Sequence, residues 1–148
     1  MRVVGVDLGR RRIGVAVSDP TATLATPWRV VDGRGGVPRV ASRLAGVLAE
    51  IAAGEPGLSR VVVGLPVHLD GRPHDEAPRA REIAWALGQR LGVPVTLRDE
   101  RLTSVEAEQR LARSGRDWRT RKTRLDAAAA AVILQEYLDE RSQETGRD

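Results

Sequence analysis

The 148-residue sequence contains no cysteine and no phenylalanine, and it has only two histidines. The lack of cysteine excludes disulfides, thiolate metal sites, iron–sulfur clusters and cysteine nucleophiles. The two histidines, His68 and His74, lie in one segment, which gives little support to a Ser-His-Asp triad or a zinc hydrolase. Any bound metal must therefore use carboxylates, imidazoles or carbonyls.

Long hydrophobic runs are also missing. The longest, at 127–134, has eight residues against the roughly 18 needed to span a bilayer, and Asp7 interrupts the N-terminus before a signal-peptide core could form. With 41% hydrophobic and 30% charged residues, the composition is typical of a soluble globular protein. We expect one domain over residues 1–140, a frayed tail at 141–148, a cytoplasmic location and no membrane partner.

Positive charge is abundant and unevenly distributed. The chain has 24 basic residues, of which Lys122 is the only lysine, and a net charge of +4. Residues 110–124 hold seven basic residues and one acid, a net charge of +6 that exceeds that of the whole chain. Because the planar guanidinium suits phosphate, this segment predicts a nucleic-acid partner. A solvated charged face, or the arginine bias of a GC-rich genome, would explain it equally simply.

Aromatic residues are scarce, with three tryptophans and one tyrosine. A stacking platform for single-stranded bases is therefore hard to build, and contact with the phosphate backbone is the better expectation.

Hydrophobic periodicity predicts strands followed by alternating helices and strands. The expected strands are 2–8, 12–18, 24–31, 60–65 and 93–98, and the expected helices are 37–51, 80–91, 103–113 and 125–138. Pro27 should weaken the third strand or push it to a sheet edge, and we expect loops at residues 66–78 and 114–122. Three meandering strands followed by strand and helix units predict an α/β fold with a mixed five-stranded sheet flanked by helices.

Three acidic positions could form a site at one end of that sheet. Asp7 ends an apolar strand on the face of Val3 and Gly5, where an ionised carboxylate is costly unless it is paired or binds a cation. Its simpler role would be to cap the turn at Gly9. Asp99 and Glu100 follow another strand and point to opposite faces, so only one of them can join Asp7; the spacing does not say which.

Asp126 is the third candidate. Together with Thr123 it has capping-box spacing, which would explain the acid by helix initiation alone. It also shares a helix face with Ala130, Ile133 and Tyr137, an apolar stripe that should lie on the sheet. Converging carboxylates repel one another unless cations neutralise them, and their hard oxygens favour Mg²⁺ or Mn²⁺. Two such ions support phosphodiester hydrolysis, so the pattern indicates a nuclease.

At these residues the sequence resembles the YqgF family of pre-16S rRNA nucleases, also described as Holliday junction resolvases, which have a ribonuclease H-like fold. The matching motifs occur in family order: VDLG at 6–9, RIGVAVSD at 12–19, VGLP at 63–66, DG at 70–71, DERLTS at 99–104, and Asp126 before residues 128–135. The chain departs from the family at His68 and in the segment after Gly71, and it has Ala129 where better-known junction resolvases carry a fourth acid.

The resemblance implies that Asp7, Glu100 and Asp126 are the catalytic acids that bind Mg²⁺ or Mn²⁺. It also implies that basic residues contact the nucleic-acid backbone, and our expected set is Arg11, Arg12, Arg101, Arg121, Lys122 and Arg124. Gly9, Asp99 and Thr103 are expected to support the site. The expected partners are structured RNA, above all pre-16S rRNA, or branched DNA, and ribosomal particles.

Three functions remain open at this stage. The first is a metal-dependent endonuclease, for either pre-16S rRNA 5′-end processing or junction cleavage. The second is a module that binds ribosomal precursor RNA without cutting it, which needs only the charge at 110–124. The third is a phosphotransferase of the actin and sugar-kinase type, suggested by Asp7 to Gly9 and Gly14, although that superfamily pairs two such domains. The sequence does not define an oligomeric state.

Overall fold

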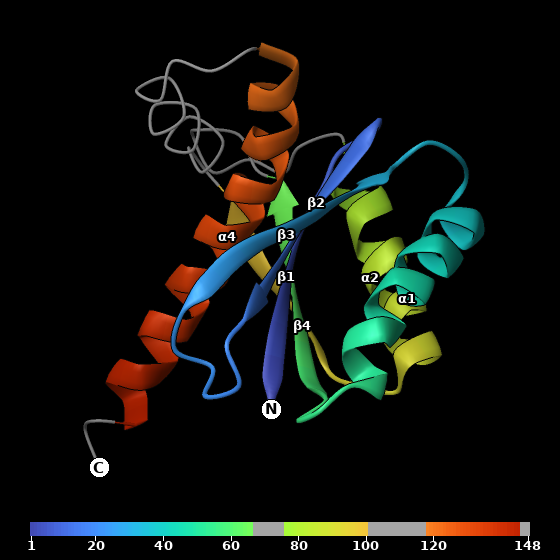
Figure 1. Ribbon diagram of the computed structural model, residues 1–148. Coiled ribbons are helices and arrows are strands. Elements are labelled where there is room, and N and C mark those ends of the chain that lie inside the picture. Colours follow the sequence, from blue (N-terminus) through green and yellow to red (C-terminus); the bar gives the residue numbers. More distant parts are fainter. Residues whose placement is uncertain (67–75, 101–117, 146–148) are drawn as a thin grey trace.

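The computed structural model describes residues 1–66, 76–100 and 118–145, and side chains for most of these. They form a five-stranded sheet with two helices on one face and one on the other (Figure 1). The strands are β1 (Arg2–Leu8), β2 (Arg12–Ser18), β3 (Ala25–Asp32), β4 (Leu58–Pro66) and β5 (Val95–Glu100). The helices are α1 (Val37–Ala53), α2 (Ala77–Leu91) and α4 (Trp118–Thr145).

The sheet is mixed, with the strand order β3-β2-β1-β4-β5. β1 pairs with β2, and β2 with β3, in antiparallel fashion, whereas β1, β4 and β5 run parallel. The predicted α/β fold is therefore confirmed. Pro27 lies in β3, an edge strand, where its missing N–H costs no ladder hydrogen bond on the outer side.

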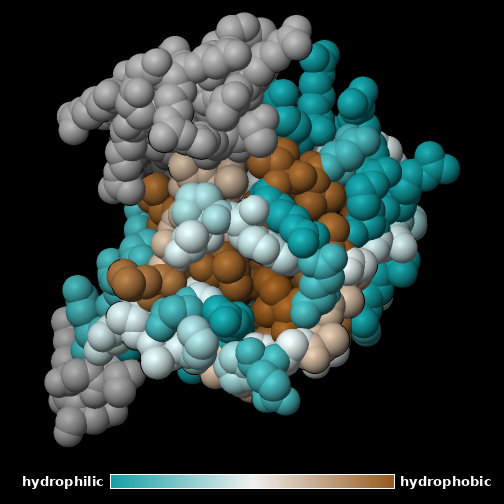
Figure 2. Space-filling model, viewed as in Figure 1, coloured by the Kyte–Doolittle hydropathy of each residue, from teal (hydrophilic) through white to brown (hydrophobic). Residues whose placement is uncertain are grey.

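Side-chain alternation along β1 separates two hydrophobic cores. Val4 and Val6 are fully buried against α1 and α2, whereas Val3 packs on the opposite face with residues of α4. In the space-filling view, hydrophilic residues cover the right-hand side over α1, and hydrophobic residues show through at the centre (Figure 2). Every odd-numbered position of β1, including Asp7, therefore belongs to the face that α4 covers.

Two glycines let α4 approach the sheet closely. A Cβ atom added to Gly5 would lie 2.7 Å from Cβ of Leu134 and 2.9 Å from the carbonyl oxygen of Ala130. A Cβ atom added to Gly14 would lie only 1.8 Å from the carbonyl oxygen of Asp126. Real Cβ contacts are not this short, so any side chain at either position would push α4 away from β1 and β2.

Several predicted elements have different boundaries in the structure, and two of these differences affect the candidate site. The strand predicted at 93–98 is β5, which extends to Glu100, so Asp99 and Glu100 lie inside the strand and not beyond it. The predicted basic loop at 114–122 is wrong for residues 118–122, which form the first turns of α4. The capping-box interpretation of Asp126 is also wrong, because the helix begins eight residues earlier, at Trp118.

Some predictions fall outside the described residues. They include the helix predicted at 103–113, residues 67–75 of the predicted loop with both histidines, and residues 110–117 of the basic segment. Within the described part of the chain, no helix combines the length and the apolarity needed to cross a membrane.

Candidate active site

Asp7 lies near the carboxyl end of β1, in the middle of the sheet. Its neighbours across the ladder are two glycines, Gly14 of β2 and Gly64 of β4. Because glycine has no side chain, neither neighbouring strand places a side chain beside Asp7 on the face covered by α4. The Asp7 side chain is half-buried, which fits a carboxylate that works at the rim of the core.

Asp126 reaches the same end of the sheet from the other layer. It lies in the interior of α4, where an acid has no capping role, and Ala130 and Ile133 on the same stripe are buried against the sheet, as predicted. Its Oδ2 is 2.8 Å from Nε of Arg12 on β2. Both side chains of this ion pair are partly shielded, with 36% of Arg12 and 26% of Asp126 exposed.

The structure brings Asp7 and Asp126 together through Gly14. Asp7 and Gly14 are ladder partners, and the Asp126 carbonyl oxygen contacts the empty Cβ position of Gly14. Antiparallel partners have Cα atoms about 4.5–5.5 Å apart, which puts the backbone of Asp126 within about 10 Å of the Asp7 Cα atom. Two carboxylates separated by about 120 residues therefore share one end of the sheet.

The register of β5 separates Asp99 from Glu100. Gly64 pairs with Arg98, and Pro66 pairs with Glu100. Arg98 contacts α4, so strand alternation assigns the Glu100 position to the α4 face and Asp99 to the opposite face, where it is exposed. Of these two acids, Glu100 is therefore the one whose position lies on the same face of the sheet as Asp7 and Asp126.

β5 lies two strands away from β1, with β4 between them. Strands are spaced by about 4.8 Å, so β5 is about 10 Å from β1 across the sheet, and Gly64 lies between them at the level of Asp7. No side chain of β4 stands at that level on the α4 face.

Sequence reasoning missed Arg98, which ties β5 to α4. Its guanidinium donates hydrogen bonds of 2.7 and 2.5 Å to the two carboxylate oxygens of Glu140, and it lies 3.5 Å from Glu136. These hydrogen bonds lower the pKa of Glu140 and raise that of Arg98. The sequence does show that Glu136 and Glu140 are four residues apart, a helical spacing that puts both on the same face, where they could bind one arginine.

The β1–β2 hairpin is held rigidly beside the acids. Gly9 donates its N–H to the carbonyl oxygen of Arg12 at 3.1 Å, and a Cβ atom at Gly9 would lie 2.4 Å from that same oxygen. The Gly33 N–H donates to the carbonyl oxygen of Arg11, whose side chain is exposed. Arg10 forms an ion pair with Glu76 at the start of α2, which connects the hairpin to the helix layer on the other face.

Other predicted site residues lie outside the described part of the chain. They are Arg101 and Thr103, and the side chains of Arg121, Lys122 and Arg124. The Glu100 side chain is also outside it, so a three-acid cluster is not represented among the described side chains, which contain no group of three potential metal ligands.

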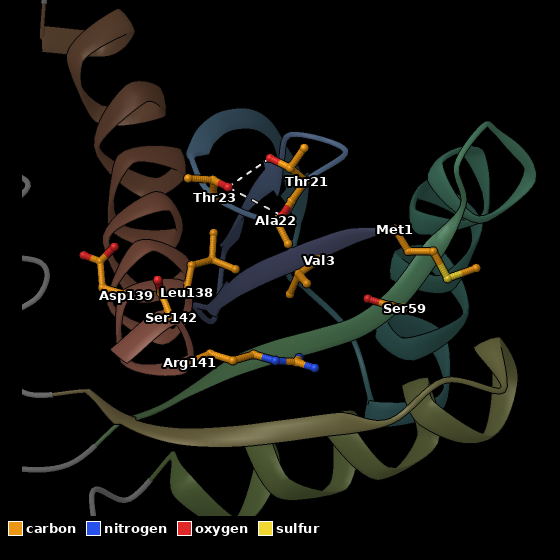
Figure 3. Close-up of a pocket in the computed structure, with 10 residues that line it drawn as sticks. All are labelled: Met1, Val3, Thr21, Ala22, Thr23, Ser59, Leu138, Asp139, Arg141 and Ser142. Carbon is orange, nitrogen blue, oxygen red and sulfur yellow. Dashed lines mark hydrogen bonds between the residues drawn. The ribbon is translucent and has the colours of Figure 1, made fainter. Parts of the chain in front are cut away.

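A cavity of about 620 Å³ lies at the other end of the sheet. Met1 and Ser59, at the starts of β1 and β4, line it together with Thr21 and the C-terminal half of α4, and the close-up shows Arg141 reaching across it (Figure 3). Asp139 is its only acidic lining residue among those described. Among the described residues, the cavity therefore offers no second carboxylate with which Asp139 could share a cation.

Comparison with solved structures identifies the fold. The chain matches RuvC of T. thermophilus, solved in complex with a Holliday junction substrate, with a TM-score of 0.55, 18% identity and 96% coverage of both chains. It matches the fowlpox virus Holliday junction resolvase with a TM-score of 0.56 and 15% identity, over 95% of this chain and 99% of that one. The protein thus has the ribonuclease H-like fold of these resolvases.

The particular family follows from the sequence comparisons. The model of the RuvX family, described as Holliday junction resolvase, matches residues 1–140, and the chain belongs to this family. A relative from Anaeromyxobacter dehalogenans, named "Putative pre-16S rRNA nuclease", is 46% identical over 96% of this chain and 99% of its own length. A relative of the same name from Thermosynechococcus vestitus is 42% identical, over 95% and 89%. The predicted family is confirmed, and the protein is a nuclease, an enzyme of the hydrolase class.

Proposed function

We propose that this protein is a metal-dependent endonuclease in which Asp7, Glu100 and Asp126 bind Mg²⁺ or Mn²⁺. The observation that carries the proposal is the meeting of Asp7 and Asp126 across Gly14, on the sheet face that also holds the Glu100 position. Carboxylate oxygens are the ligands that these hard cations prefer, so the donor set fits them. A divalent cation held by these residues would supply the activation of water and the stabilisation of charge on the leaving oxygen that phosphodiester hydrolysis needs.

The protein's own residues hold this site in shape. Gly64 leaves the β4 side of Asp7 without a neighbouring side chain, and Gly14 lets the backbone of Asp126 approach the sheet. Arg98 connects β5 to α4 through Glu140. Arg12 balances the charge of Asp126 and, beside the exposed Arg11, presents a guanidinium to the phosphates of the substrate. This contact would be extended by Arg101, Arg121, Lys122 and Arg124, and Thr103 would support it. Asp99 lies exposed on the other face of the sheet, so we do not assign it the supporting role that the sequence led us to expect.

The substrate we propose is pre-16S rRNA, cut at its 5′ end. The names of the relatives contain the words pre-16S rRNA nuclease, which supports the RNA part of this proposal. Precursor rRNA in ribosomal particles matches the excess of arginine and a cytoplasmic location. A four-way DNA junction is the second candidate, because the family description and both solved relatives refer to Holliday junctions.

The purified protein should cut labelled pre-16S leader RNA in the presence of Mn²⁺ or Mg²⁺ and leave it intact in EDTA. The same assay with a labelled four-way DNA junction compares the two substrates directly, and cleavage of the junction alone would reject the RNA assignment. Salt-sensitive RNA binding without any metal-dependent product would show a binding module instead of a nuclease.

Replacement of Arg12 by Gln should tighten Mn²⁺ binding to the nucleic-acid-free protein by about 2- to 5-fold, the range expected for removing one partly exposed ion pair. The reason is that Arg12 and a cation compete for the carboxylate of Asp126. Isothermal titration calorimetry measures the change, and Arg11→Gln is the matched control, because Arg11 is exposed in the hairpin. Weaker Mn²⁺ binding in Arg12→Gln would mean that Arg12 positions Asp126 for the metal.

A further inference from the structure

The outer face of α2 carries an exposed tryptophan that the site does not use. Trp85 is 70% exposed, whereas Ile83, Ala84 and Leu87 of the same helix are buried in the core. Leu97 of β5, which lines a groove together with Trp85, is 37% exposed, and neighbouring exposed apolar residues mark an interaction surface.

Trp85 and Arg81 form a ridge between two shallow grooves. Residues four positions apart on a helix are neighbours, and both side chains line both grooves. One groove, of about 430 Å³, lies towards Val37 and Pro38 of α1 and includes Arg90. The other, of about 400 Å³, extends to Val95 and Leu97 of β5.

The charges around Trp85 favour an anionic occupant. Arg81 and Arg90 line the grooves, against the single acid Glu82. An exposed indole beside guanidinium groups is the combination that binds single-stranded nucleic acid, because a base stacks on the ring while arginines contact phosphates. An acidic protein segment would pair with the arginines but would bring no base to stack on the indole.

The position of α2 connects this surface to the proposed active site. Glu76, directly before α2, is paired with Arg10 of the β1–β2 hairpin, so α2 starts at the end of the sheet that holds Asp7 (Figure 1). Trp85 is eight residues beyond Ala77, a rise of about 12 Å along the helix. Because α2 and the acids lie on opposite faces of the sheet, a strand leaving the acids must pass around this end of the sheet to reach Trp85.

We propose that Trp85, Arg81 and Arg90 bind an unpaired segment of RNA that flanks the cleavage site, with one base stacked on the indole of Trp85. This inference rests on the proposed RNA substrate, and it specifies that the substrate has a single-stranded extension next to its structured part. The proposed stacking involves a single ring, so it needs none of the other scarce aromatic residues.

The test uses fluorescence anisotropy to measure how tightly the full-length protein binds a fluorescein-labelled oligouridylate in EDTA. Trp85→Ala should weaken binding by about 5- to 100-fold, the range measured for loss of one base-aromatic stack. Trp85→Phe should retain most of the affinity, and Arg81→Ala and Arg90→Ala should each lower the slope of binding against salt by about one. Leu24→Ala, at a residue that is 64% exposed, is the matched control and should bind like the wild type.

Unchanged affinity in Trp85→Ala would overturn the inference. The inference would also be overturned if Trp85→Ala left RNA affinity unchanged but lowered the molecular mass measured by light scattering. That result would mean that the surface joins two copies of the chain. Since the assay contains no metal, these results do not depend on cleavage. If the wild type showed no metal-dependent cleavage, the proposed function would be rejected. If the wild type cleaved RNA but Trp85→Ala bound the oligouridylate normally, only the binding role of this surface would be rejected.

Discussion

Replacement of Asp7 by Asn should reduce the rate of metal-dependent cleavage by at least about 100-fold. Asn keeps the size and one acceptor oxygen of Asp but removes the charge that a divalent cation needs. Loss of a residue that only supports a metal ligand costs about 10- to 100-fold, so loss of a ligand itself should cost more. The measurement is single-turnover cleavage of labelled RNA at saturating Mn²⁺.

The structure offers a matched pair of controls on β5. Glu100→Gln should reproduce the loss seen in Asp7→Asn, whereas Asp99→Asn should cleave at close to the wild-type rate, because Asp99 is exposed on the other face of the sheet. Thermal unfolding should be nearly unchanged in Asp99→Asn. Full activity in Asp7→Asn, or an Asp99→Asn variant as inactive as Glu100→Gln, would contradict the assignment of the acids.

Gly14→Ala should have the largest effect on folding. The added methyl group would lie 1.8 Å from the Asp126 carbonyl oxygen, so α4 must move away from β2. Overpacking of this kind costs about 1–3 kcal/mol, and at about 2–4 °C per kcal/mol for a chain of this size the expected fall in Tm is about 2–12 °C. Cleavage should fall as well, because the same shift moves Asp126 away from Asp7.

Gly46→Ala provides the control. Gly46 lies in the interior of α1, and nothing occupies the space within 4 Å of its missing Cβ atom. Alanine in a helix is favoured over glycine by about 0.5–1 kcal/mol, so this variant should be more stable than the wild type and equally active. Differential scanning calorimetry distinguishes the two glycines, and a Gly14→Ala variant with wild-type Tm and activity would show that α4 does not depend on this contact.

Local patterns were sufficient for most of the fold. Strands β1 and β2 have the predicted limits, because β-branched runs are bounded by a glycine turn, and Pro27 correctly indicated an edge strand. The errors arose where a run of charged residues was interpreted as the end of a strand or as a loop. Arg98 to Glu100 continue β5 because β4 offers a ladder as far as Pro66, and residues 118–122 are helical because arginine and lysine are good helix formers and no breaker intervenes.

The sequence by itself determined the layer architecture and the candidate acids, because these depend on periodicity and on residue types that are rare in cores. It also indicated the family, through short motifs that occur in the family's order. Only the tertiary structure decided which acids share a face. The register of β5 assigns the Glu100 position to the α4 side, and the close approach at Gly14 brings Asp126 to Asp7. Such relations depend on strand pairing and helix packing between distant segments, and no local pattern encodes them.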